Sequence, residues 1–252
     1  MVVEPRYKEG SIGTATSKWD INRFGSLYLE PSRNGVYKSA EYQGRGTRIV
    51  NMGEMFGLEF ISNQEMSRVF LTPKEISITG LVDGDLLFGR RSVVPAGAGK
   101  CSVVVNPPEP LTFESSIIRV RLDKTKTSPL FYYYFFASSV GRALMSTIIS
   151  GTNVKGIRAT ELRELKVLQP NPAEQRVIAK ALSDVDALLD GLERLIAKKR
   201  DLKQAVMQQL LTSQTRLLGF HGEWDVCQLG DLIEKNGGGR NTEPRKSSFL
   251  GK

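Results

Sequence analysis

Residues 40–51, which we expect to form a loop through Arg48 and then a strand, combine side chains that bind nucleic acids with a backbone that can approach a ligand closely. The stretch holds two glycines, Gly44 and Gly46, whose missing side chains leave room for a phosphate or a base. Its arginines and amides are the groups that hydrogen-bond to phosphates and to base edges. A polar hairpin loop explains the composition equally well, so both interpretations stay open. The nucleic-acid interpretation predicts contacts by Gln43, Arg45, Arg48 and Asn51.

Two other short segments offer the same chemistry. A pattern typical of a turn and a buried strand covers residues 81–91 and ends in two adjacent arginines, and a glycine-flanked loop occupies residues 150–156. Basic and amide side chains at a strand end or in such a loop can reach a nucleic acid. We therefore predict four more nucleic-acid contacts: Arg90, Arg91, Asn153 and Lys155.

The sequence holds no set of residues that predicts catalysis. His221 is the only histidine, and no serine or cysteine accompanies it in the manner of a catalytic triad. Neither a phosphate-binding loop, a dinucleotide fingerprint nor a metal-ligand spacing is present. Asp83 and Asp85 flank a glycine, which is typical of a turn. We predict a binding module rather than an enzyme, with no catalytic residue, no metal ligand and no cofactor.

The composition indicates a polyanionic partner. The net charge is +8, and residues 1–170 carry 22 lysines and arginines against 16 acidic residues. This excess favours nucleic acid, although many soluble proteins are mildly basic. Two cysteines are too few for a disulfide framework, and the sequence shows no signal peptide or apolar run of membrane length. We expect a cytoplasmic protein that does not bind membranes.

The segment from Pro172 to Thr212 has the pattern of one long helix. Proline suits a first helical turn, and the segment contains no other proline and a single glycine, Gly191. Apolar residues recur at spacings of four and three in two neighbouring stripes, a surface too wide for one seam. One face is expected to pack on the globular part of the chain and the other on a partner helix, with an ordinary core helix as the alternative. The predicted dimerisation residues are Ile178, Leu182, Val185, Leu189, Leu192 and Ile196.

Two segments far apart in the chain repeat one another. Residues 19–27 and 224–232 agree in type at six positions, and both tryptophans of the chain open these segments. The offset predicts one whole repeat unit and the opening of a second. Within the first unit we expect short strands over residues 68–94. We also expect the aromatic run over residues 131–136 to pack in a core rather than to stack on bases.

The long helix, the repeat and the glycine-arginine segments together resemble the DNA-specificity subunits of type I restriction-modification systems. The most specific motif is Pro-Ala-Glu-Gln-Arg-Val-Ile-Ala over residues 172–179, followed by Met-Gln-Gln-Leu-Leu-Thr over residues 207–212. Further matches are Trp19, Gly84-Asp85 and Gly151-Thr152.

The resemblance implies a mixed α/β (α+β) fold. One globular target-recognition domain would be followed by a long helix that forms an antiparallel coiled coil with a partner helix. The expected divisions are a lead-in over residues 1–18, the recognition domain over 19–170, the spacer helix over 171–213, and a loose tail that starts a second repeat over 214–252.

The resemblance also implies a function. Such a subunit binds double-stranded DNA in a sequence-specific way, each recognition domain reads one half of a bipartite site, and the subunit itself is not catalytic. The implied partners are methyltransferase subunits and, through them, the restriction subunit, and cofactor chemistry belongs to these partners. A homodimer through the long helix is expected. The alternative function is a truncated decoy that occupies the methyltransferase without reading DNA.

Overall fold

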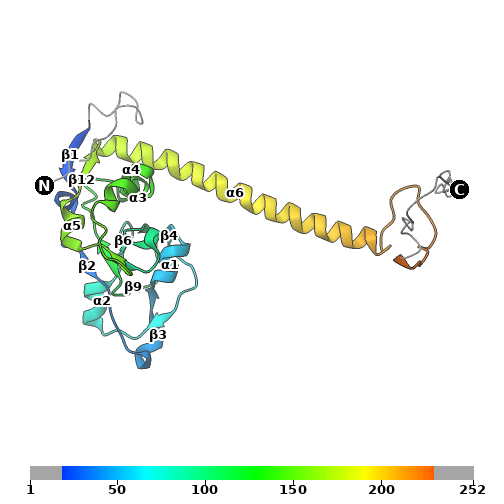
Figure 1. The fold of residues 1–252 in the computed structure, drawn as a ribbon, viewed down its shortest axis with the longest axis horizontal. Helices are drawn as coiled ribbons and strands as arrows, with labels where there is room; N and C mark the ends of the chain where they lie inside the picture. Colours follow the sequence, from blue (N-terminus) through cyan, green and yellow to red (C-terminus); the bar gives the residue numbers. More distant parts are fainter. Residues whose placement is uncertain (1–18, 230–252) are drawn as a thin grey trace, which may run out of the picture. The chain divides into compact units, whose positions relative to one another are not determined.

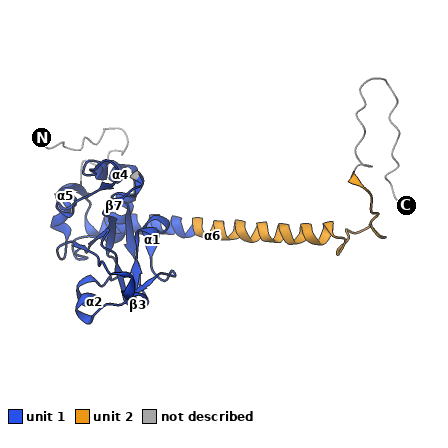
Figure 2. Ribbon diagram, turned by 60° about the horizontal axis from the view of Figure 1, so that its bottom comes forward, with its two compact units in different colours: residues 1–188 blue, residues 189–252 orange. Residues whose placement is uncertain are grey.

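The computed structural model describes residues 19–229 and divides the chain into two compact units, residues 1–188 and 189–252 (Figure 2). Helices and strands alternate through the first unit, which confirms the predicted mixed α/β class. No helix within the described range is both long and apolar enough to cross a membrane.

A five-stranded sheet forms the centre of the first unit (Figure 1). Its strands, in spatial order, are β2 (Arg33–Asn34), β10 (Ile117–Val120), β6 (Leu86–Gly89), β8 (Cys101–Val104) and β4 (Phe60–Ile61). The three central strands are antiparallel neighbours and buried along their whole length. Their side chains alternate between two hydrophobic clusters, as a sheet covered on both faces requires.

Helices cover both faces of this sheet. Leu86 and Phe88 point into a cluster shared with α3 (Pro129–Ala137) and α4 (Ser139–Ser146). Leu87 lies between them in sequence and points into the opposite cluster, beside α1 (Met52–Gly57). The aromatic run supplies much of the first cluster, since Phe131, Tyr132, Tyr133 and Phe136 are buried, and the predicted core role is thereby confirmed.

A second sheet carries the first candidate contact segment. It contains β5 (Arg68–Val69), β3 (Gln43–Val50) and β9 (Leu111–Phe113), with β3 in the middle. The expectation of a loop through Arg48 was wrong, because the strand begins at Gln43. Gly44 and Gly46 have φ of 87° and 92°, and the pairing with β5 shifts register between Gln43 and Thr47. The glycines therefore form a bulge inside a strand rather than a free loop.

The expectation of short strands over residues 68–94 is confirmed for β5, β6 and β7 (Arg91–Ser92) but missed a helix. A helix, α2 (Pro73–Thr79), lies between β5 and β6. Thr72 and Glu75 form a capping box, with Thr72 N–H donating to Glu75 at 2.9 Å, and Pro73 occupies the first turn. This start signal was present in the sequence and specifies a helix. The remaining short strand of the region, β7, follows β6 directly.

Short elements close the first unit. β1 (Asp20–Arg23) pairs antiparallel with β12 (Lys166–Gln169), and β7 pairs with β11 (Lys155–Gly156). Helix α5 (Ala159–Glu164) lies between β11 and β12. Three short 3₁₀ helices complete the described elements: η2 (Phe24–Leu27), η3 (Ala40–Tyr42) and η4 (Pro95–Gly97).

The predicted long helix is present as α6 (Pro172–Leu211), with 40 residues. Polar contacts fix its first turns. The buried amide of Gln175 accepts from Thr127 Oγ1 at 2.7 Å and donates to Pro170 O at 2.7 Å, and Glu174 accepts from the Trp19 indole at 3.2 Å. One turn further on, Ala179 is buried in the α3–α4 cluster.

Candidate nucleic-acid interface

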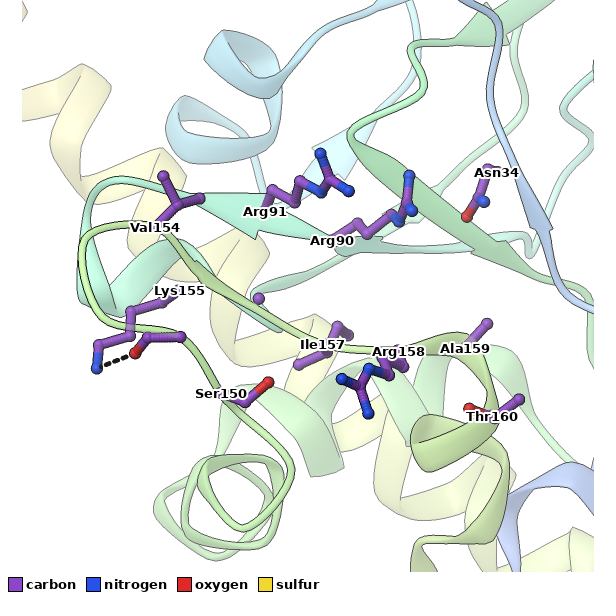
Figure 3. A pocket seen from close by; sticks show the side chains of 12 residues that line it. Asn34, Arg90, Arg91, Ser150, Val154, Lys155, Ile157, Arg158, Ala159 and Thr160 are labelled. Carbon is purple, nitrogen blue, oxygen red and sulfur yellow. Dashed lines mark hydrogen bonds between the residues drawn. The ribbon is translucent and has the colours of Figure 1, made fainter.

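Strands β7 and β11 bring two of the candidate segments together. Lys155 pairs with Ser92 and Gly156 pairs with Arg91, so the arginines after β6 lie beside the loop at 150–156. The two segments form walls of a groove of about 640 Å³ (Figure 3). Its lining includes Asn34, Arg90, Arg91, Ser150, Lys155, Arg158 and Thr160.

Glycines allow this close pairing. A side chain at Gly156 would place its Cβ 2.8 Å from Arg90 O, which is closer than real Cβ contacts come. Gly151 has a φ of 105° and opens the loop, which Ser150 and Gly156 close with two main-chain hydrogen bonds of 2.9 Å. The loop is therefore held at both ends, and its exposed tip carries Asn153.

Two cations of the groove donate to main-chain carbonyl oxygens rather than to carboxylates. Arg90 donates to Ser115 O at 3.3 Å and Lys155 Nζ donates to Gly151 O at 2.7 Å, the contact drawn as a dashed line in Figure 3. A carbonyl oxygen accepts a hydrogen bond from each of these side chains but carries no negative charge to offset the positive one. None of the described residues that line the groove is acidic. Arg158, whose side chain is 75% exposed, lies 3.5 Å from the half-buried Glu161, a long contact that offsets its charge only weakly.

The structure brings together three of the four residues predicted in these two segments. Arg90, Arg91 and Lys155 line the groove, and Asn153 stands exposed beside it without lining it. Sequence reasoning missed Asn34 and Arg158, which also line the groove. Arg158 follows the predicted loop by two residues, so a wider window around the loop would have found it. Asn34 lies on a two-residue strand far away in sequence and gave no signal.

The arginines at the β3 edge are used differently. Arg48 is 4% exposed, its Nε lies 2.8 Å from Glu109 Oε1, and one terminal nitrogen donates to Gln64 O at 3.2 Å. Arg68 forms two hydrogen bonds with Glu109, at 2.8 and 3.2 Å. These hydrogen bonds and the charge of Arg68 hold the pKa of Glu109 below its ordinary value. Because the Arg48 side chain is buried, its guanidinium cannot reach a base, and Arg48 is not among the proposed DNA contacts.

The other predicted residues of this segment divide into two groups. Gln43 and Arg45 are exposed at the bulge, where the Arg45 guanidinium lies 5.7 Å from the centre of the Phe70 ring. Asn51 instead belongs to the start of α1. Its N–H donates to Glu54 at 2.9 Å and its amide donates to Ser67 Oγ at 2.8 Å.

Buried charges elsewhere in the unit have structural partners. Asp85 is fully buried and accepts two hydrogen bonds of 2.7 Å from Arg121, and Arg119 lies 2.7 Å from Glu30. Between residues 19 and 229 no three His, Cys, Asp or Glu side chains gather as a metal site would require.

The six predicted dimerisation residues lie on α6 in two environments. Ile178 packs against the α3–α4 cluster of its own unit. The other five, Leu182, Val185, Leu189, Leu192 and Ile196, are between 41% and 53% exposed. Exposed apolar side chains in one continuous row are uncommon on protein surfaces.

Comparisons with known proteins agree with this architecture. A family model described as type I restriction modification DNA specificity domain matches residues 74–200. The putative MjaX specificity subunit of Methanocaldococcus jannaschii is 24% identical over 244 residues, which is 90% of this chain and 56% of the relative. The EcoKI specificity subunit of Escherichia coli is 24% identical over 89% of this chain and 51% of the relative. The chain thus spans about half the length of these relatives.

Solved structures support the fold. The S subunit of a type I system from M. genitalium aligns with a TM-score of 0.51 and 19% identity, over 76% of this chain and 45% of that one. The HsdS subunit of Thermoanaerobacter tengcongensis aligns with a TM-score of 0.51 and 16% identity, over 81% and 51%. Because the family model covers half of the sequence, the chain belongs to the type I restriction-modification DNA specificity family.

Proposed function

We propose that this chain recognises duplex DNA as the non-catalytic specificity component of a type I restriction-modification complex. Family membership supports the role, and the groove beside the paired strands β7 and β11 is the observation that carries it. The groove collects four cations from two segments and has no acidic lining residue within the described chain. Such a surface suits the phosphates of a DNA backbone.

Phosphate contacts and base contacts are assigned to different side chains. Arg90, Arg91, Lys155 and Arg158 bind phosphates and fix the position of the domain on the duplex. Amide side chains discriminate bases because they both donate and accept hydrogen bonds. The base-reading candidates are Asn34 and Asn153 at the groove and Gln43 with Arg45 at the bulge.

The proposed organisation follows the chain order. Residues 19–170 form the target-recognition domain, residues 171–213 form the spacer helix, and residues 214–252 begin a second repeat. Two copies pair through the exposed stripe of α6, so that a dimer presents two recognition domains for the two halves of a bipartite site. Methyltransferase subunits bind this dimer and recruit the restriction subunit.

Mapping of modified bases tests the DNA-reading role. The chain is co-expressed with the methyltransferase subunit of its own system, and modified positions in the host DNA are compared with a strain that lacks the chain. We expect one new bipartite motif. The double variant R91A/K155A should lose this modification, whereas R23A/K124A, which removes the same charge from cations that pair with Glu164 and Asp83, should keep it.

The decoy alternative makes a different prediction in the same experiment. A decoy would bind the methyltransferase subunit, as co-purification would show, and would create no new modified motif. That result would contradict the proposed function.

Light scattering tests the pairing of two copies independently of DNA. Leu192 is 47% exposed on α6, so L192D should convert the dimer to a monomer while the circular dichroism spectrum stays helical. A wild-type chain that is monomeric at micromolar concentration would contradict the homodimer.

A further inference from the structure

Gly191 lies near the middle of α6, and no neighbouring atom in the described part of its own chain explains why a glycine is needed there. Glycine is disfavoured in a helix interior relative to alanine. A Cβ at Gly191 would meet no atom within 4 Å, so no contact within the described chain requires its small size. Its position is nearly central, because α6 begins at Pro172 and ends at Leu211. The absence of a side chain is useful there if a second helix approaches.

Along one line of the helix, the residues on either side of Gly191 are complementary in charge to those of an antiparallel second copy. Residues seven apart lie on nearly the same line along a helix. The line through Gly191 reads Val177, Asp184, Gly191, Lys198 and Ala205. When two copies run antiparallel about Gly191, aspartate faces lysine on both sides and the apolar Val177 faces Ala205. Val177 is 70% exposed in one copy, and this arrangement gives it an apolar neighbour.

The charge of the whole helix has the same symmetry. Residues 172–191 contain four acidic and two basic residues, and residues 192–211 contain two acidic and five basic ones. Compensation of the helix dipole acts only in the terminal turns and does not account for charges near the middle. An antiparallel second copy places the acidic half of each helix against the basic half of the other. A parallel copy would place like charges together.

We propose that two copies of α6 cross antiparallel with Gly191 at the twofold axis, and that Asp184 of each copy pairs with Lys198 of the other. This inference rests on the proposed self-association of the chain and specifies its register. A twofold axis makes the two contacts identical. In this register the apolar side chains nearest the axis, Val185, Leu188, Leu192 and Leu195, fill the centre of the pair.

Asp184 also forms a salt bridge with Lys180 of its own helix. Lys180 Nζ lies 2.6 Å from Asp184, and both side chains are more than half exposed. An exposed pair of this kind is weak and leaves the carboxylate able to bind a second cation. In the dimer, Asp184 lies between Lys180 of its own copy and Lys198 of the other.

Charge exchange tests the register in the full-length chain. D184K and K198D each place like charges across both contacts of a homodimer, so each variant alone should dimerise more weakly than wild type. A mixture of the two restores opposite charges in the heterodimer at both contacts. We expect heterodimers to exceed a random mixture by about tenfold in the exchange constant, measured by native mass spectrometry. The double variant D184K/K198D should dimerise as wild type.

A matched control separates register from general charge effects. D201K makes the same charge change on the side of the helix opposite Leu192. Mixed with K198D, it should give random exchange. Random exchange for D184K with K198D, alongside a wild-type dimer, would overturn the register and leave the homodimer intact. A monomeric wild type would instead overturn the proposed self-association itself.

The G191A variant tests whether two helices approach closely at Gly191, because it should raise helix stability and weaken dimerisation. G191A should raise the thermal midpoint of the helix in the monomer, because alanine is the better helix former. It should also weaken dimerisation by about tenfold or more, because the added methyl groups meet across the axis. A197L adds bulk away from the stripe and should leave dimerisation unchanged. A G191A variant that dimerises as tightly as wild type, or more tightly, would overturn the crossing at Gly191.

Discussion

Two pairs of arginines on the first unit differ in what they contact. Arg48 and Arg68 share the carboxylate of Glu109, with the Arg48 side chain almost fully buried. Arg90 donates to a main-chain carbonyl and Arg91 is exposed on the groove wall. The first pair shares one carboxylate within the protein, whereas Arg90 and Arg91 have no carboxylate partner within the described chain. The identity of the acceptor, rather than the presence of arginine, separates this structural cluster from the proposed DNA surface.

The largest expected effect comes from Arg48. R48M keeps the aliphatic stem and removes the guanidinium, leaving Gln64 O and part of Glu109 without a partner. We expect a loss of about 3 kcal/mol of stability, or ~6–12 °C in thermal midpoint. The folded fraction should bind DNA as wild type does. Reduced DNA affinity at unchanged stability would place Arg48 at the DNA interface, and the two arginine pairs would then not differ in role.

The groove should respond in the opposite way. R91A/K155A removes one exposed and one half-buried cation and should leave the thermal midpoint within about 1 °C of wild type, as surface substitutions usually do. DNA affinity should fall by about 2 kcal/mol, or ~30-fold. Equilibrium binding to a duplex that carries the mapped motif measures the loss. Unchanged affinity would exclude the groove as the DNA surface.

Arg45 lies between these extremes, exposed at the β3 bulge over the Phe70 ring. R45A should cost about 1 kcal/mol of affinity for the correct site and relax specificity at one base pair. R45K is the matched variant, since it keeps the charge and loses the bidentate fork. Uniform weakening on all sequences by R45A, with full rescue by R45K, would reassign Arg45 to a phosphate.

The smallest effect is a pH dependence at Glu109. Its hydrogen bonds with Arg68 lower its pKa from the ordinary 4.5. A carboxylate with a lowered folded pKa adds stability above its unfolded pKa and loses it as the pH falls through the folded value. The thermal midpoint of wild type should therefore fall below pH 4.5 more steeply than that of E109Q. Parallel profiles would show that the ion pair contributes nothing.

The sequence predicted the long helix better than it predicted the groove. Helix α6 follows from local signals, namely a proline at its start and a continuous apolar period, so its first residue and its length were both expected. The groove depends on β7 and β11, two strands of two residues each from distant parts of the chain. Such short strands have no readable period. Both candidate segments were recognised, and their pairing was not.

Arg48 shows a second limit of sequence reasoning. Arg45 and Arg48 are three residues apart in one strand, yet one is exposed at a bulge and the other is buried. The difference arises because β3 enters the core after Thr47, where Glu109 from a distant turn meets it. Nothing in the sequence around Arg48 predicts that Glu109 is its partner.

The salt dependence of DNA binding tests the central claim most directly. Association constants for a duplex with the mapped motif are measured over a range of salt concentrations, with the chain assembled with its methyltransferase subunits. Each phosphate contact contributes about −0.9 to the slope of log K against log salt for duplex DNA. The account predicts that R91A/K155A reduces the slope by about 1.8, whereas R48M and the control R23A/K124A leave it unchanged. An unchanged slope in R91A/K155A, or an equal reduction in R48M, would contradict the assignment of the groove beside the β7–β11 pair as the phosphate-binding surface.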